Sequence, residues 1–242
     1  INNDRLAHAY ILTGVRGVGK TTTARLIAMS INCKNRDKKN FEPCGNCDSC
    51  KSTTSDSNLD VIEIDAASNT GVDDIREIID NVKYKPVIGD YKIFIIDEVH
   101  MLSKSAFNAL LKTLEEPPEH VKFIFATTEI KKVPITVVSR CQRFDLSRVK
   151  SLELFNFIKV IKEKENGNIS DEALKLIVKI SEGSVRDALS LLDRAMLSEN
   201  EKSELDLKGA QKIFGYFDKS YLISLFRFLF QGDEKEVIKA YR

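Results

Sequence analysis

One stretch near the start of the chain has the residue types and spacing needed to bind a polyphosphate. Gly14–Thr21 fits the pattern G-x-x-x-x-G-K-[ST] at every fixed position. The glycines let the backbone curl so that successive N–H groups face one point, and a following helix adds its positive N-terminus. Lys20 is placed to reach the β- and γ-phosphates of a nucleoside triphosphate, and the Thr21 hydroxyl to bind Mg²⁺. The predicted nucleotide-binding residues are Gly14, Val15, Arg16, Gly17, Val18, Gly19, Lys20, Thr21 and Thr22.

Two carboxylates follow a strongly apolar segment later in the chain, where Ile93–Ile96 leads into Asp97 and Glu98. Ligands of open α/β sheets bind at the carboxyl ends of the strands, where a phosphate loop also lies. We predict that Asp97 holds the Mg²⁺ through water and that Glu98 polarises the water that attacks the γ-phosphate. An acidic loop start is common after any strand. Together with the phosphate loop, however, the pair favours ATP hydrolysis over phosphoryl transfer to a substrate.

Four of the five cysteines are crowded into one polar segment as C-x10-C-x2-C-x2-C, at Cys33, Cys44, Cys47 and Cys50. Two consecutive C-x2-C steps let thiolates converge on one tetrahedral ion. Unligated thiols and an iron–sulfur cluster are the alternatives. The insertion lacks apolar residues that would shield a cluster, so the pattern favours structural Zn²⁺. Four cysteine ligands leave no open coordination position, and we interpret the site as a brace.

Two polar residues have more than one interpretation. Thr128 ends a predicted strand, where its hydroxyl either contacts a phosphate or the attacking water, or caps the strand. Arg186 lies in the first turn of a helix, where the helix dipole disfavours a cation. Its partner is either a nucleotide phosphate or the neighbouring Glu182 or Asp187. The residues alone do not decide either case.

Other candidates carry less information. Arg140 precedes the last predicted strand and reads by itself as a surface residue. Its neighbour Cys141 reads as a core thiol rather than a fifth metal ligand. His8, His100 and His120 have no partners at metal or triad spacing, and we assign them no chemistry.

Apolar periodicity places these residues on an α/β framework. Strands are expected over residues 9–13, 59–65, 91–96, 122–127 and 143–146, and the polar segment 33–57 is expected to be a loop. Strands alternate with helices up to residue 146, which predicts a parallel sheet flanked by helices. Beyond it only helical periods occur, over 152–164, 170–180, 184–197, 205–214 and 221–230. We predict a P-loop domain at 1–148 with the zinc insertion at 33–50, a helical lid at 149–204 and the start of a third helical domain at 205–242.

The amino-acid composition limits the kinds of partner and cellular location that we expect. The 242 residues are 43% hydrophobic and 30% charged, and 37 Lys and Arg nearly balance 36 Asp and Glu. Any nucleic-acid contact must therefore come from a local patch. No apolar run approaches a membrane span and nothing resembles a secretion signal, so we expect a soluble, cytoplasmic protein. The chain begins at Ile1 without Met and ends at Arg242 inside a predicted helix, and we expect a piece of a longer protein.

Taken together, these motifs resemble the AAA+ ATPases and, within them, the γ/τ clamp-loader family of bacterial DNA polymerase III. The resemblance covers nearly all of the chain, and a four-cysteine insertion within an AAA+ core together with Ser-Arg-Cys is highly specific. The stretches that carry it are residues 8–10, 14–21, 33–50, 63–68, 96–103, 109–120, 126–128, 139–141 and 183–190.

The resemblance implies roles for the ambiguous residues. Thr128 is similar to the family's sensor 1, and Arg186 to sensor 2 on the helical lid. Arg140 is similar to an arginine finger that acts in trans on ATP bound by a neighbouring subunit. The resemblance also implies that a segment preceding Ile1 helps hold the adenine and that the ring-forming collar domain begins near Leu205.

The resemblance also implies the biological setting. The family forms a ring of further copies of itself with δ and δ′ subunits, opens the β sliding clamp when ATP is bound, and grips primer-template DNA. The polymerase III core is bound through regions absent here, and we expect no polymerase active site.

Three other functions are disfavoured by particular residues of the chain. The four-cysteine insertion disfavours another AAA+ DNA motor, such as a branch-migration ATPase. Intact Lys20-Thr21 and Asp97-Glu98 pairs disfavour a non-hydrolysing scaffold subunit of the same complex. A zinc module that reads DNA directly is disfavoured because the cysteines have few basic neighbours and no aromatic platform.

Overall fold

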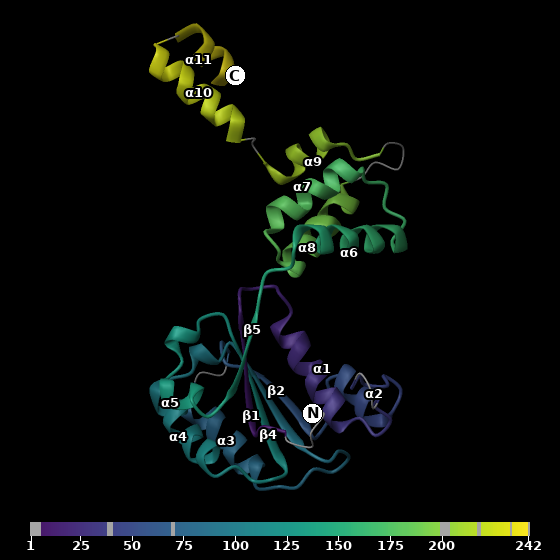
Figure 1. The fold of residues 1–242 in the computed structure, drawn as a ribbon, viewed down its shortest axis with the longest axis vertical. Helices are drawn as coiled ribbons and strands as arrows, with labels where there is room; N and C mark the ends of the chain where they lie inside the picture. The colour runs from purple at the N-terminus through teal and green to yellow at the C-terminus, as the bar shows by residue number, and fades with distance from the viewer. Residues whose placement is uncertain are drawn as a thin grey trace. The chain divides into compact units, whose positions relative to one another are not determined.

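The computed structural model of the protein describes residues 6–37, 41–68, 71–198, 204–216, 219–232 and 234–241. The chain divides into two compact units, Ile1–Arg148 and Val149–Arg242 (Figure 1). The division falls where the strand-containing part of the chain ends.

The first unit is built on a five-stranded sheet in the order β2-β3-β4-β1-β5. The strands are β1 Ala9–Gly14, β2 Val61–Asp65, β3 Lys92–Asp97, β4 Val121–Thr127 and β5 Gln142–Leu146. Every neighbouring pair is parallel, which confirms the predicted sheet. Because β4 lies between β1 and β3, the end of β4 at Thr127 falls between the phosphate loop and the Asp97-Glu98 pair.

Short helices and turns connect these strands. They are α1 Lys20–Asn32, α2 Asp48–Thr54, α3 Val72–Val82, η1 Val99–Met101, α4 Lys104–Glu115, η2 Ile130–Lys132 and α5 Ile135–Val138. Helix α2 corrects the prediction that 33–57 is a loop throughout. It has an acidic first residue, Asp48, next to the positive helix end. Its hydroxyls bond back to carbonyls one turn earlier, as Thr53 does to Ser49 at 2.8 Å. The helix contains few apolar residues, so no apolar periodicity in the sequence indicates it.

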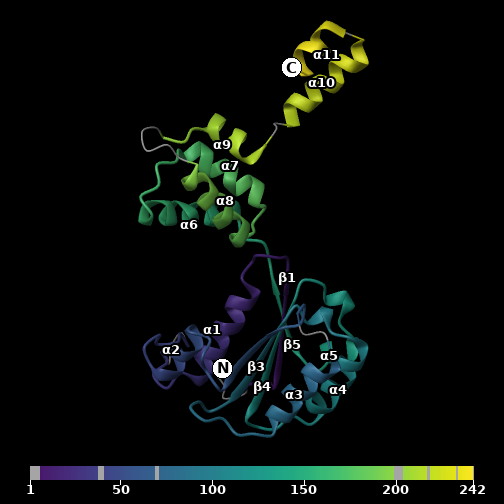
Figure 2. The ribbon, with the colours of Figure 1, turned by 180° about the vertical axis from the view of Figure 1, so that it is seen from behind.

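Strand alternation separates two apolar layers. Phe94, Ile96 and Phe123 pack in one buried cluster with the apolar faces of α3 and α4, whereas Ile93 and Ile95 pack in another with α1. The two views show the same sandwich, with α1 and α2 on one side of the sheet and α3, α4 and α5 on the other (Figures 1 and 2). Each such buried side chain contributes about 1.5–3 kcal/mol of transfer free energy. This rigid sheet fixes the strand ends that carry the polar residues.

The second unit is helical in all its described elements apart from an isolated bridge between Ile169 and Leu205. Its helices are α6 Ser151–Lys164, α7 Asp171–Ser181, α8 Val185–Leu197, α9 Leu207–Phe214, α10 Lys219–Gln231 and α11 Glu234–Tyr241. Helices α6 to α9 share one apolar cluster, in which Ala210 of α9 is fully buried. The predicted lid boundary at 204 therefore leaves out a helix that packs with the lid helices. Helices α10 and α11 contact each other.

Helices α8 and α3 begin with different N-caps. The Ser184 hydroxyl caps α8 by accepting the backbone N–H of Asp187 at 3.2 Å. Gly71 is the N-cap of α3, and its backbone N–H donates to the Asp74 carboxylate at 3.0 Å.

Candidate functional site

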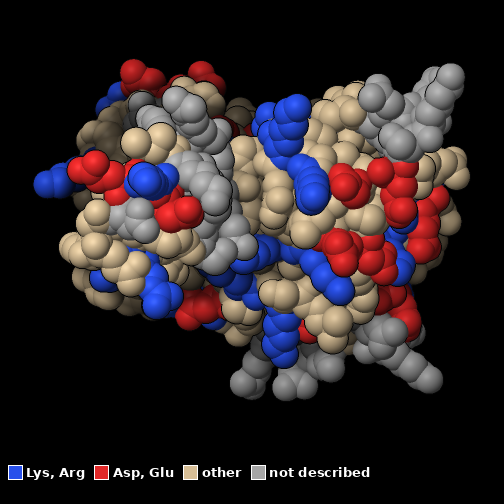
Figure 3. All heavy atoms as spheres, turned by 90° about the horizontal axis from the view of Figure 1, so that it is seen from above, with Lys and Arg blue, Asp and Glu red and all other residues tan. Residues whose placement is uncertain are grey.

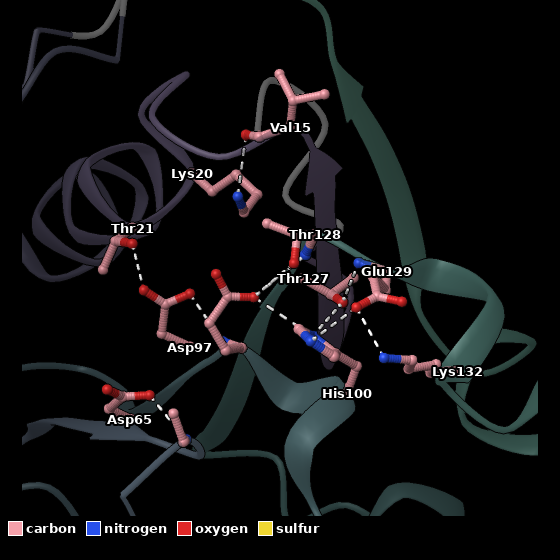
Figure 4. A network of polar contacts seen from close by, with 12 residues as sticks. Val15, Lys20, Thr21, Asp65, Asp97, His100, Thr127, Thr128, Glu129 and Lys132 are labelled. Atoms are coloured by element: carbon pink, nitrogen blue, oxygen red, sulfur yellow. Dashed lines mark hydrogen bonds and ion pairs between the residues drawn. The ribbon is translucent and has the colours of Figure 1, made fainter. Parts of the chain in front are cut away.

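The phosphate loop joins β1 to α1 with the backbone that its glycines allow. Gly14 and Gly19 have φ angles of 155° and 93°, which residues with a side chain rarely adopt. A Cβ atom on Gly14 would lie 2.5 Å from the carbonyl oxygen of Leu146 in β5, so only glycine fits there. Lys20 is 6% exposed, and its Nζ donates to the carbonyl oxygen of Val15 at 3.2 Å (Figure 4). The ammonium group therefore lies against the loop it was predicted to serve.

The two residues predicted to hold Mg²⁺ meet at the edge of the sheet. The Thr21 hydroxyl donates to Oδ2 of Asp97 at 2.5 Å, and Oδ1 of Asp97 accepts the backbone N–H of Glu98 at 2.8 Å. Asp65 is the register partner of Asp97 on β2 and adds a second carboxylate to this edge. Hydroxyl and carboxylate oxygens are the ligands that Mg²⁺ prefers, so the donor set fits this ion.

Glu98 and Thr128 also come together, from β3 and β4. Glu98 has φ 45° and ψ 43°, a left-handed backbone that is uncommon for residues other than glycine. Its Oε2 accepts the Thr128 hydroxyl at 3.0 Å and the Thr128 backbone N–H at 3.3 Å. The structure thus brings two predicted site residues into direct contact.

The structure adds one residue that the sequence analysis set aside. The His100 side chain is only 6% exposed, and its Nδ1 lies 3.3 Å from Oε2 of Glu98 and 3.1 Å from the Thr127 hydroxyl. Its Nε2 lies 3.7 Å from Oε1 of Glu129. Lys132 pairs with Glu129 at 2.8 Å and, through that hydrogen bond, holds the pKa of the Glu129 carboxyl below its usual range. The pairing of strands, and not sequence spacing, brings His100 to these partners.

Arg140 lies away from this cluster, two residues beyond the end of α5. Its Nη2 pairs with Oε1 of Glu115 in α4 at 2.6 Å, and its Nη1 donates to the carbonyl oxygen of Thr136 at 2.6 Å. The guanidinium is held by its own chain, with a third of the side chain exposed. The next residue, Cys141, donates its thiol to Val137, and burial raises its pKa to about 12.

Arg186 belongs to the second unit, in the first turn of α8. The side chain is exposed. Its pairing with a nucleotide phosphate rather than with Glu182 or Asp187 stays a prediction.

The four-cysteine segment folds into one compact cluster. The Sγ atoms of Cys33, Cys44, Cys47 and Cys50 all lie within 4.8 Å of one another, and those of Cys33 and Cys47 are 4.0 Å apart. A tetrahedral zinc site with Zn–S bonds of about 2.3 Å needs sulfur separations of about 3.8 Å. All four are free thiols, and Cys33 and Cys50 are buried. Geometry and ligand chemistry both fit a structural zinc ion.

The thiols differ in their protein environment. Hydrogen bonds from the backbone N–H groups of Asn46 and Cys47 lower the pKa of Cys44 to about 6, whereas burial raises the pKa of Cys50 to about 12. The backbone of this segment therefore already favours one thiolate. A bound divalent ion would favour the charged form at the others as well.

The surface carries both signs of charge. Figure 3 shows basic and acidic side chains exposed together on one face, in keeping with a net charge of +1. Within the ranges that the structure describes, no helix is long and apolar enough to cross a membrane.

Comparison with known protein families identifies the chain. The family model described as DNA polymerase III, delta subunit, matches residues 1–150. A second model, the ATPase lid domain of the DNA polymerase III clamp loader subunit, matches residues 155–200. The chain belongs to the DNA polymerase III clamp-loader family.

Curated members of the family include close relatives of this chain. It is 47% identical to the DNA polymerase III subunit gamma of Buchnera aphidicola from Schizaphis graminum, over 97% of this chain and 63% of that protein. It is 45% identical to subunit tau of Bacillus subtilis and 43% identical to subunit tau of Escherichia coli. Those alignments cover 97% of this chain but only 41% and 36% of the relatives. The chain therefore spans between about a third and just under two thirds of these clamp-loader proteins.

Solved structures support the AAA+ fold. The Thermotoga maritima RuvB Holliday junction branch migration motor has a TM-score of 0.61 at 19% identity, covering 93% of this chain and 68% of that one. A DNA polymerase III gamma subunit-related protein from the same organism has a TM-score of 0.51 at 20% identity, covering 99% and 73%. At these identities the likeness concerns the fold alone. It confirms the predicted P-loop architecture.

Proposed function

We propose that this chain is the ATP-hydrolysing part of a clamp-loader subunit. It binds ATP with Mg²⁺ and uses binding and hydrolysis to open the β sliding clamp and load it onto primed DNA. The observation that carries the proposal is the convergence of Lys20, Asp97, Glu98 and Thr128 from three strand ends onto one edge of the sheet. A subunit that only binds partners needs no carboxylate placed there.

The phosphate loop provides the binding part of the mechanism. Residues 14–22 supply backbone N–H donors and the N-terminus of α1 for the phosphates, and Lys20 supplies a buried positive charge. Thr21 and Asp97 would hold the magnesium ion, which neutralises charge on the phosphates when it is bound. The hydrogen bond between the Thr21 hydroxyl and the Asp97 carboxylate supports this assignment, because it brings the two proposed ligands together.

Glu98 and Thr128 provide the chemical part. The Glu98 carboxylate accepts a proton from the attacking water, and the Thr128 hydroxyl fixes one of its oxygens. Arg140 acts in trans on ATP held by a neighbouring subunit, after it leaves Glu115. Arg186 contributes a further positive charge from the lid.

The remaining features fit the same role. The four cysteines bind zinc as a brace for the polar insertion. The partners are the δ and δ′ subunits, further copies of the same subunit, the clamp and primer-template DNA, and the setting is the bacterial cytoplasm. Polymerase chemistry belongs to other subunits.

Steady-state ATP hydrolysis tests the proposal. The full-length protein is assembled with δ, δ′, clamp and primed DNA, as wild type and as Glu98→Gln, Arg140→Ala and the surface variants Glu119→Gln and Arg76→Ala. Loss of a general base is expected to lower turnover about a hundredfold or more, and loss of an arginine finger at least as much. The two surface variants should match wild type.

Three results would contradict the proposal. Absence of clamp- and DNA-stimulated hydrolysis by wild type would favour a scaffold subunit. Stimulation by branched DNA without any clamp would favour a branch-migration motor. Full turnover by Arg140→Ala would remove the trans role of that residue.

A further inference from the structure

His100 stands out because a buried ring faces a carboxylate on each side. Its side chain is 6% exposed, Nδ1 lies 3.3 Å from Glu98 and Nε2 lies 3.7 Å from Glu129. Figure 4 shows dashed lines that run from the His100 ring to the side chains of Thr127 and Glu129. Such an imidazole has few orientations open to it, because both nitrogens have polar partners and the ring is enclosed.

The contacts of Thr127 help to decide whether Nδ1 of His100 carries a proton. The Thr127 hydroxyl oxygen already accepts the backbone N–H of Glu129 at 3.0 Å and lies 3.1 Å from Nδ1 of His100. A lone pair on Nδ1 would also face Oε2 of Glu98, which repels it. A proton on Nδ1 is attracted to both oxygens. The geometry therefore favours the Nδ1–H form on the side of Glu98.

The two oxygens of Glu98 are used differently. Oε2 takes the hydroxyl and the N–H of Thr128 and faces His100. Among the residues that the structure describes, none forms a hydrogen bond or ion pair with Oε1. The carboxylate is thus fixed through one oxygen, which leaves the other to accept a proton from water.

Glu98 needs such support. It has a left-handed backbone, and a glutamate side chain loses up to about 1.5–2 kcal/mol of conformational freedom when it is held in one rotamer. Thr128 restrains it from the end of β4. His100, two residues further along the same chain, restrains it through a ring that is itself held in place.

We propose that His100 is a positioning residue for Glu98, which it holds through Nδ1–H with the aid of Thr127. The inference rests on the proposed function, because it names the residue that positions Glu98, the general base proposed above. His100 transfers no proton to the nucleotide and makes no contact with it.

Three substitutions separate the two ring nitrogens. His100→Asn places an amide near Nδ1 and can still donate to Glu98, whereas His100→Gln reaches the position of Nε2 and faces Glu129. His100→Leu removes both groups, and His120→Leu removes an imidazole that contacts only the carbonyl oxygen of Val82 among its described partners. The full-length protein is assayed for kcat and KM with ATP and Mg²⁺, for equilibrium binding of ADP, and for thermal unfolding.

We expect kcat to fall about tenfold or more in His100→Leu and His100→Gln, with ADP affinity within about twofold of wild type. His100→Asn should retain most of the turnover, within about threefold of wild type. Because Asn and Gln are both polar, their comparison holds even where the Leu variant does not fold.

Other outcomes overturn the inference. Equal kcat in the Gln variant and wild type, or equal losses in Asn and Gln, would show that Nδ1 does not support the base. A parallel loss of ADP affinity would show a role in binding or folding. In these cases wild type still hydrolyses ATP and the proposed function stands. If neither wild type nor His120→Leu hydrolyses ATP, both fail.

Discussion

The strongest prediction for stability concerns Asp60, a buried carboxylate just before β2. Its side chain is 1% exposed, and it accepts the backbone N–H groups of Val87, Ile88 and Gly89 at 2.7, 2.6 and 2.8 Å. One charge therefore orders the loop that leads into β3, and β3 ends in Asp97 and Glu98. The perturbation is Asp60→Asn, which keeps the shape but removes the charge.

The magnitude follows from the three bonds. In wild type, three charge-assisted hydrogen bonds contribute about 2 kcal/mol each. In the variant, the amide oxygen keeps two neutral hydrogen bonds of about 1 kcal/mol each, whereas the new NH₂ group faces the third N–H and cannot accept it. The difference is a loss of about 4 kcal/mol. Val87 is 75% exposed, so water can reach part of the freed backbone. We therefore expect a loss of about 3 kcal/mol, equivalent to a fall in melting temperature of roughly 6–12 °C.

Two measurements check this loss. Amide hydrogen exchange of residues 87–89 should be about a hundredfold faster, and calorimetry should show the lower melting temperature for the first unit. Asp90→Asn makes the same chemical change at an exposed position in the same loop and should leave both unchanged. Equal behaviour of the two variants would refute the argument that the buried carboxylate orders the loop.

Three further predictions concern the loop, the cysteines and pH. Gly14→Ala should abolish ADP binding in a calorimetric titration, because its Cβ would meet Leu146. Gly45→Ala also adds a Cβ at a positive φ, of 70°, but nothing lies within 4 Å of it and it is outside the phosphate loop, so this variant should bind ADP normally. The purified protein should contain close to one zinc ion per chain by metal analysis; Cys50→Ala should lose it and Cys141→Ser should keep it, and zinc loss in both would contradict the cluster. Hydrogen bonds from the Thr13 hydroxyl and then from Arg143 lower the pKa of the Asp145 carboxyl below its ordinary value of 3.8. The stability that the charged carboxylate contributes is therefore present above pH 3.8 and is lost as the pH falls through the lower pKa of the folded state. The stability difference between wild type and Asp145→Asn in urea unfolding should therefore shrink below pH 3.8, and a constant difference would contradict it.

Local spacing explains what could be predicted. In Gly14–Thr21 and in the four-cysteine segment, the groups that act together lie within a few residues, so backbone geometry alone brings them close. The ends of β3 and β4 were predicted to share an edge because strands alternate with helices, which requires a parallel sheet. Those expectations needed no knowledge of strand order.

Contacts between distant residues could not be predicted in this way. His100 looked isolated because its partners Thr127 and Glu129 come close only through the pairing of β3 with β4. The Arg140–Glu115 pair likewise depends on how α4 and α5 pack. Helix α2 was missed for another reason, since it is stabilised by side-chain to backbone bonds and by the packing of Cys50, not by an apolar stripe.

The strand order also affects how the chain is made on the ribosome. β1 is synthesised before the other four strands of this sheet, yet it pairs only with β4 and β5. About 100 residues separate its end at Gly14 from the start of β4 at Val121, which is roughly 5–20 s of synthesis at about 5–20 residues per second. During that time Ile11 and Leu12 have no strand beside them, whereas β2 and β3 can already pair. The phosphate loop that follows β1 is therefore among the last parts of the first unit to take its final position. ATP can bind only a nascent chain that has already completed its sheet.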